Sequence, residues 1–123
     1  MGSSKEIENA NLISSKTNDP RVKVYAGCFN LVNAALYIDS LDLLITLDTG
    51  PLHIAAALKV PTIAFSVAGK ITQSNPRDQL TKHIFIQKPE TCIPCIDKKC
   101  KNPFCMDQIS YQDILNAIEE IRN

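Results

Sequence analysis

The sequence predicts an α/β fold in which a parallel β-sheet is flanked by helices. Two observations carry this prediction: apolar runs of strand length alternate with helical patterns, and the connections between them are short. Two of the runs, Leu43–Leu47 and Thr62–Ser66, are almost continuously apolar, which is typical of strands covered on both faces. Strands that alternate with helices in this way favour parallel pairing with right-handed crossovers.

The N-terminal third predicts two helices and one short strand. Residues 5–15 carry apolar side chains at a loose helical spacing, and residues 17–21, Thr-Asn-Asp-Pro-Arg, favour a turn. Val22–Tyr25 alternates β-branched or aromatic residues with a charge, which predicts a strand. Residues 31–38 return to a helical spacing, with Asn30 as the expected N-cap.

The rest of the chain predicts a strand–helix–strand unit, a further strand and a closing helix. The apolar, alanine-rich stretch Pro51–Leu58 predicts a helix that lies close against the sheet, and Thr62–Ser66 follows it as a strand. His83–Gln87 predicts another strand. Ser110 and Asp113 form a capping-box pattern at the start of the last helix. Its apolar stripe consists of Ile114, Leu115, Ile118 and Ile121.

Length and charge limit the class of protein. The chain has 123 residues and predicts one domain over residues 5–123, with residues 1–4 set aside as a cloning remnant. Its 13 basic and 13 acidic residues balance, so composition gives no sign of a nucleic-acid partner. No stretch reaches the about 18 consecutive apolar residues of a membrane span, and the first residues lack the apolar core of a signal peptide. We therefore expect a cytoplasmic location.

The junction between strand and helix at residues 48–53, Asp-Thr-Gly-Pro-Leu-His, is the most informative feature of the sequence. A helix N-terminus offers backbone N–H groups and the positive end of the helix dipole to an anion. Gly50 allows a tight turn and close approach of a ligand to the backbone. The amides of Leu52 and His53 are expected to be free, and the His53 ring leans back toward the helix mouth.

Asp48 and Thr49 have two interpretations each. Asp48 ends a strand, where ligands gather in open α/β sheets, and its carboxylate suits a sugar hydroxyl better than a phosphate. Thr49 can donate its hydroxyl to a phosphate oxygen. The alternative is purely structural: both residues cap the helix or support the turn, and His53 is a packing residue.

Residues 48–65, DTGPLHIAAALKVPTIAF, resemble the core motif of glycosyltransferase family 9, the lipopolysaccharide heptosyltransferases. The resemblance extends over roughly residues 5–122 and is strongest over 43–65. It implies a Rossmann-like sheet equivalent to the C-terminal, donor-binding half of a GT-B glycosyltransferase. It also implies binding of a nucleotide-diphosphate sugar of the ADP-heptose kind, inverting transfer to a lipopolysaccharide-type acceptor, and no metal or cofactor for the chemistry.

The same resemblance assigns donor-binding roles to four residues of the junction and suggests three weaker candidates. The four are Asp48, Thr49, Gly50 and His53. The weaker candidates are Glu6, by a loose alignment, the Leu52 amide, and Lys70, which is either a phosphate-binding cation or a solvated loop residue.

The chain departs from the family pattern in two respects. After Phe65 it continues as Ser66-Val-Ala-Gly-Lys70, where the family usually has a Gly-Pro loop. The resemblance further implies an N-terminal domain that binds the anionic glycolipid acceptor and carries the general base, and we expect residues 1–123 to contain no counterpart of it. We therefore expect catalysis to require a companion N-terminal domain, and expect exposed apolar surface to favour self-association. The resemblance places such a protein at the cytoplasmic side, peripheral to the inner membrane.

Four cysteines lie within one short segment, and their spacing leaves two interpretations open. Cys92, Cys95, Cys100 and Cys105 could hold a structural zinc ion in a closed tetrahedral site, and the first pair has the usual two-residue gap. Alternatively they are reduced thiols that pack the segment. Cys28 stands apart and is interpreted as a small apolar residue. Three functions remain: a donor domain, a non-catalytic module stabilised by metal, or an inactive nucleotide-binding fragment.

Overall fold

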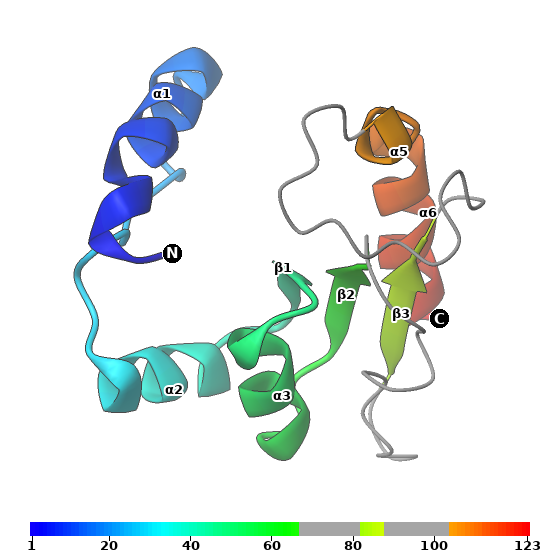
Figure 1. Cartoon of the computed structure of the whole chain (residues 1–123). Coiled ribbons are helices and arrows are strands. Elements are labelled where there is room, and N and C mark those ends of the chain that lie inside the picture. The colour runs from blue at the N-terminus through cyan, green and yellow to red at the C-terminus, as the bar shows by residue number, and fades with distance from the viewer. Residues whose placement is uncertain (67–81, 88–103) are drawn as a thin grey trace. The chain divides into compact units, whose positions relative to one another are not determined.

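The computed structural model describes residues 1–66, 82–87 and 104–123, the side chains of residues 104 and 105 excepted (Figure 1). These residues form two compact units, Met1–Tyr37 and Ile38–Asn123. The first unit is helical, and the second contains the sheet.

The first unit begins with the short 3-10 helix η1 (Ser4–Glu6), which leads into α1 (Ile7–Thr17). Residues 2–4, although outside the predicted domain, make contacts in this unit. The Ser3 side chain caps η1 by accepting a hydrogen bond from the amide of Lys5, and the Gly2 carbonyl accepts one from the amide of Gly27. Gly27 has a φ of +74°, a conformation that other residues rarely adopt.

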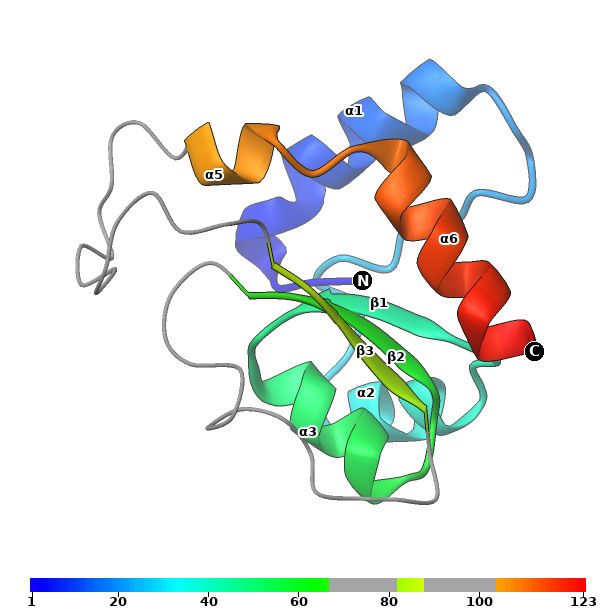
Figure 2. The same ribbon diagram turned by 90° about the vertical axis from the view of Figure 1, so that its right-hand side faces the viewer.

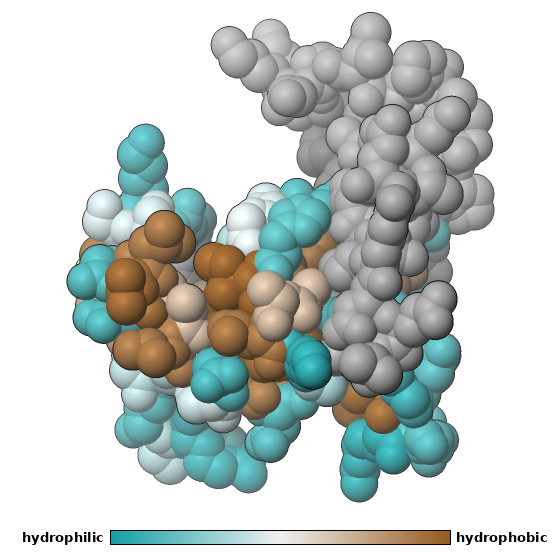
Figure 3. Space-filling view, turned by 90° about the horizontal axis from the view of Figure 1, so that it is seen from below, coloured by the Kyte–Doolittle hydropathy of each residue, from teal (hydrophilic) through white to brown (hydrophobic). Residues whose placement is uncertain are grey.

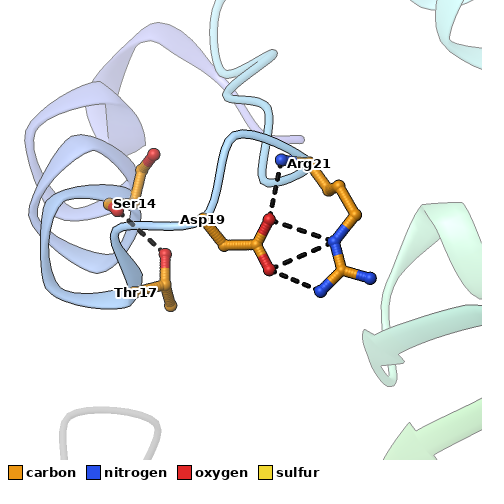
Figure 4. A network of polar contacts seen from close by, with 4 residues as sticks. All are labelled: Ser14, Thr17, Asp19 and Arg21. Carbon is orange, nitrogen blue, oxygen red and sulfur yellow. Dashed lines mark hydrogen bonds and ion pairs between the residues drawn. The ribbon is translucent and has the colours of Figure 1, made fainter.

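The turn after α1 forms as the sequence predicts (Figure 4). Asn18 ends the helix in the left-handed conformation, with φ of 48°. The carboxylate of Asp19 accepts hydrogen bonds from the Arg21 amide at 2.9 Å and from the Arg21 guanidinium. Hydrogen bonds from this guanidinium, the largest cause, lower the pKa of Asp19 below its ordinary value.

The strand predicted at Val22–Tyr25 is wrong. Only an isolated bridge forms nearby, between Gly2 and Ala26. The aromatic ring of Tyr25 instead packs on Phe29 and Tyr37, with ring centroids 5.5 and 5.1 Å apart. A strand needs a neighbouring strand to pair with, and the described part of this unit contains none. Tyr25, at the end of the predicted strand, therefore packs in an aromatic cluster instead.

The helix α2 (Leu31–Asp39) crosses from the first unit into the second. It begins as predicted, since the Asn30 side chain accepts a hydrogen bond from the amide of Asn33 at 2.8 Å. Its last buried residue, Ile38, belongs to the core of the second unit.

The second unit is built on a parallel sheet of three described strands, β1 (Leu44–Leu47), β2 (Thr62–Phe65) and β3 (His83–Ile86). The strands follow one another in the order β1-β2-β3, so β2 is central. The three strands pair without stagger, so that their last residues are aligned: Leu47 lies opposite Phe65, and Phe65 lies opposite Ile86. All three strands therefore end at one edge, the carboxyl edge of the sheet.

Helices pack on both faces of this sheet (Figure 2). The expectation that both apolar runs are covered on both faces is nevertheless wrong for β1, in which Ile45 and Leu47 are 45% and 50% exposed. The helix α3 (Gly50–Ala57) packs on one face and α6 (Tyr111–Arg122) on the other, with the short α5 (Phe104–Asp107) preceding α6. The core accordingly has two parts. The part on the α3 side consists of Ile38, Leu44, Ala55 and Val60; the part on the α6 side consists of Ile63, Ile86 and Ala117, with the partly buried Phe65, Ile84, Ile114 and Ile118.

Local hydrogen bonds define the start of α6 and the end of α3. The Ser110 side chain accepts from the Asp113 amide at 3.3 Å, while Asp113 accepts from the Ser110 amide at 2.8 Å, which confirms the predicted capping box. The helix α3 ends in a Schellman motif, in which the amide of Val60 bonds the Ala55 carbonyl at 2.9 Å. Lys59 occupies the left-handed position of this motif, with φ of 61°.

The α/β fold with a parallel sheet flanked by helices is confirmed. Among the helices in the described part of the chain, none has the length and apolar character needed to cross a membrane.

Candidate functional site

The predicted junction lies at the carboxyl edge of the sheet. The amide of Asp48 donates to the Phe65 carbonyl at 3.1 Å, so the ladder between β1 and β2 extends one residue past the end of β1. This bond holds Asp48, whose side chain is half-buried, at the point where β1 gives way to α3. Strand ends of this kind are where open α/β sheets bind ligands.

Thr49 connects strand and helix without capping the helix through its side chain. Its backbone is extended, and both its amide, at 2.8 Å, and its hydroxyl, at 3.4 Å, donate to the Leu47 carbonyl. The interpretation of Thr49 as a side-chain helix cap is therefore wrong. The residue is exposed, and its hydroxyl oxygen still has acceptor capacity, because the observed bond uses only the hydrogen.

Gly50 begins α3 and faces open space. The first reason given for Gly50, that it allows a tight turn, finds no support in its backbone, since the φ of Gly50 lies outside the left-handed region. Apart from the adjoining residues and the backbone of α3, no described residue has a heavy atom within 4 Å of a Cβ built there. The second reason for a glycine, room for a ligand beside the backbone, is consistent with this opening.

Leu52 and His53 play different parts from each other. The amide of Leu52 donates to the Thr49 carbonyl at 3.0 Å, so the expectation that it is free is wrong, and its side chain is fully buried in the core. The tight turn from Thr49 into α3 is the reason, because it brings that carbonyl within reach. His53, one residue later, is exposed in the first turn. Its side chain, like that of Thr49, is therefore accessible to a ligand at the helix mouth.

A residue that sequence reasoning did not assign also lies at this edge. Ser66 follows β2 directly, and its amide donates to the Ile86 carbonyl at 3.3 Å. Its side chain is buried, and its hydroxyl has no hydrogen-bond partner in the described part of the chain. The available signal was the departure from the Gly-Pro pattern at this position.

The remaining candidates belong to the first unit or fall outside the described residues. Glu6 belongs to the first unit, where its carboxylate accepts a hydrogen bond from the Ser3 hydroxyl; this bond, the largest cause, lowers the pKa of Glu6. Lys70 lies outside the described residues, as do Cys92, Cys95, Cys100 and the side chain of Cys105. Cys28, interpreted as an apolar residue, is exposed. Within residues 1–66, 82–87 and 104–123, no three His, Cys, Asp or Glu side chains gather as metal ligands would.

A parallel sheet flanked by helices, with a helix that starts at its carboxyl edge, defines the class of open, Rossmann-like α/β folds. Comparison with known families is more specific: residues 1–105 match the sequence model of glycosyltransferase family 9 (heptosyltransferase). The chain belongs to glycosyltransferase family 9.

Curated relatives agree with this assignment. The chain is 32% identical over 83 residues to lipooligosaccharide heptosyltransferase 2 of Campylobacter jejuni, a match that covers 65% of this chain and 26% of the relative. It is 37% identical over 87 residues to a putative glycosyltransferase of Haemophilus influenzae, a match that covers 68% of this chain and 25% of the relative. A third relative, lipopolysaccharide heptosyltransferase 1 of Campylobacter coli, is 31% identical over 93 residues, a match that covers 76% of this chain and 26% of the relative.

The chain thus matches about a quarter of the length of these relatives. A comparison with solved structures gives no significant match.

Proposed function

We propose that this chain is a donor-binding part of a family 9 glycosyltransferase and binds a nucleotide-diphosphate sugar of the ADP-heptose kind at residues 48–53. The observation that carries the proposal is the open space at Gly50, beside the exposed His53, at the carboxyl edge of the sheet. Family membership supports glycosyl transfer as the activity of the whole enzyme.

Each residue of the junction has a chemical role in this proposal. Gly50 leaves room for the diphosphate beside the start of α3, where the helix dipole favours negative charge. His53 donates a hydrogen bond to a diphosphate oxygen, and the Thr49 hydroxyl donates one after it turns away from the Leu47 carbonyl, which it contacts at 3.4 Å in the structure. The Asp48 carboxylate accepts hydrogen bonds from sugar hydroxyls. Such preorganised groups stabilise the diphosphate as negative charge develops on it during transfer.

The transfer step itself needs a second part of the enzyme. The acceptor hydroxyl attacks the anomeric carbon as the bond to the diphosphate oxygen breaks, and the configuration at that carbon inverts. The proton of the acceptor passes to a general base. We assign that base, and the anionic glycolipid acceptor, to a companion domain, and we expect no metal or cofactor in the chemistry.

Isothermal titration calorimetry of the full chain with ADP and ADP-heptose tests donor binding. We expect saturable binding that Asp48→Ala and His53→Ala each weaken, the first for the sugar nucleotide more than for ADP. Asp42→Asn is the matched control, because Asp42 is exposed and precedes β1, at the opposite edge of the sheet. If the chain binds neither ligand, or if the control weakens binding as much, the proposal fails.

Exposed apolar side chains support the proposal that the isolated chain self-associates or meets a companion domain. Figure 3 shows apolar side chains gathered at the surface. On α2, Leu31, Val32 and Leu36 are 75%, 67% and 65% exposed. Light scattering tests self-association, and Leu36→Glu is expected to lower the apparent mass; a monodisperse monomer at high concentration would contradict it.

The cysteine spacing supports a second, structural proposal. We infer that Cys92, Cys95, Cys100 and Cys105 hold one zinc ion in a closed site that stabilises the C-terminal part of the chain. Metal analysis of the purified protein should then give about one zinc per chain, and Cys92→Ser should abolish it. Zinc content without nucleotide affinity would instead favour a non-catalytic module. A location peripheral to the inner membrane fits the glycolipid acceptor and is likewise proposed.

A further inference from the structure

We propose that Ser66 is an additional ligand-binding residue of this site, whose hydroxyl donates a hydrogen bond to a phosphate oxygen of the nucleotide diphosphate. The inference rests on the proposed function and adds a residue to it. Three observations support it: the place of Ser66 in the sheet, the face of the sheet toward which its side chain points, and its unsatisfied hydroxyl.

Ser66 lies at the carboxyl edge, next to the junction. The amide of Ser66 bonds the Ile86 carbonyl at 3.3 Å, which continues the ladder between β2 and β3 beyond Phe65. On the other side, Phe65 accepts the hydrogen bond from the amide of Asp48. The residue before Ser66 is therefore tied directly to the first residue of the candidate site.

The side chain of Ser66 points toward the face that α3 covers. Ile63 and Phe65 pack in the cluster beneath α6. Because side chains alternate between the two faces of a strand, Ala64 and Ser66 point to the opposite face. That face carries α3, whose first residue, Gly50, stands at the same edge. The Ser66 hydroxyl and the mouth of α3 thus belong to the same corner of the unit.

The hydroxyl of Ser66 has no partner where it is buried. The residue is 4% exposed, and no described residue hydrogen-bonds its Oγ. Buried polar groups in native proteins are nearly always hydrogen-bonded, because an unsatisfied one is destabilising. Serine has three staggered χ1 rotamers, so a change of rotamer redirects the hydroxyl. A phosphate oxygen at the α3 mouth would satisfy it.

The experiment measures the affinities of ADP and of adenosine, each for the wild-type chain and for the Ser66→Ala variant. A hydrogen bond to a charged oxygen corresponds to roughly 10-fold or more in affinity, so Ser66→Ala should weaken ADP binding by about that factor. Adenosine lacks phosphate, and its affinity should change little. Ser66→Thr keeps a hydroxyl and should bind ADP more tightly than Ser66→Ala does. Thermal unfolding of Ser66→Ala should not begin at a lower temperature, because an unsatisfied buried group is removed.

Two results would overturn the role of Ser66. One is an ADP affinity of Ser66→Ala equal to that of the wild type. The other is an equal loss for ADP and adenosine together with a lower melting temperature, which indicates a structural role. If Asp48→Ala and His53→Ala weaken ADP binding while Ser66→Ala does not, the proposed function stands and only this inference fails. If the wild-type chain does not bind ADP, both fail.

Discussion

Gly50→Ala separates the needs of the fold from the needs of a ligand. A Cβ at Gly50 would meet no heavy atom of the described residues within 4 Å beyond its chain neighbours and the α3 backbone, and the φ of Gly50 lies outside the left-handed region. The described fold therefore has room for alanine. Gly50 is also the first residue of α3, and alanine favours helix over glycine. The free energy of unfolding should therefore rise by about 0.4–1 kcal/mol, since such substitutions chiefly reduce the entropy of the unfolded chain.

The same methyl group should harm binding. It enters the space that we assign to the diphosphate, so ADP affinity should fall about 10-fold or more, a change of ~1.4 kcal/mol or greater in binding free energy. Differential scanning calorimetry measures the first effect, with an expected increase of roughly 2–6 °C in melting temperature. Isothermal titration calorimetry measures the second.

Gly27→Ala is the matched control. Gly27 has φ of +74°, and a Cβ there would lie 3.0 Å from Ile7 Cδ1 and 3.3 Å from Ser4 Cα. This variant should lower the melting temperature. If Gly50→Ala is destabilised like Gly27→Ala, the account of its backbone is wrong. If Gly50→Ala is stable and binds ADP as tightly as the wild type does, the space beside Gly50 is not the ligand site.

Three further predictions concern local structure. Lys59→Gly should raise the free energy of unfolding by about 1 kcal/mol, because Lys59 holds a left-handed φ of 61° at the end of α3. Denaturant titrations measure this change, and an unchanged free energy would contradict the left-handed conformation of Lys59. Ser110→Ala should lower it by about 1 kcal/mol through loss of the capping box, and Ser110→Asp should recover most of that loss. The pKa of Asp19 is lowered by Arg21, so the stabilisation from this pair is present above the unfolded pKa of about 3.9 and is lost as pH falls through the lower, folded pKa. An NMR titration should place the pKa of Asp19 in the wild-type chain below the ordinary value for aspartate, and Arg21→Ala should return it to that value. Equal Asp19 midpoints in the wild type and in Arg21→Ala would refute the pairing.

The elements of the second unit could be predicted because local signals agree with the tertiary structure. Continuous apolar runs predicted the strands at Leu44–Leu47 and Thr62–Phe65. The second strand is largely buried, as such a run predicts, whereas Ile45 and Leu47 of the first are exposed. Ser110 and Asp113 specified the start of α6 by a local hydrogen-bond pattern that depends on nothing distant. The strand predicted at Val22–Tyr25 failed because alternation does not supply the neighbouring strand that pairing requires.

The candidate site could be predicted only in part, for a similar reason. The type and order of residues 48–53 placed a strand end beside a helix start, which is a local property. The bond from the Leu52 amide to the Thr49 carbonyl depends on the tightness of the turn, which residue types alone do not determine. The proximity of Ser66 to Asp48 depends on the register of β1 and β2, and no single segment encodes that register.

A titration of the isotope-labelled chain with ADP-heptose, followed by backbone amide NMR, tests the central claim most directly. The account predicts saturable chemical-shift changes that are largest at residues 48–53 and at Ser66, and that Asp48→Ala and His53→Ala diminish. Shift changes centred on another part of the chain, or none at millimolar ligand, would contradict it.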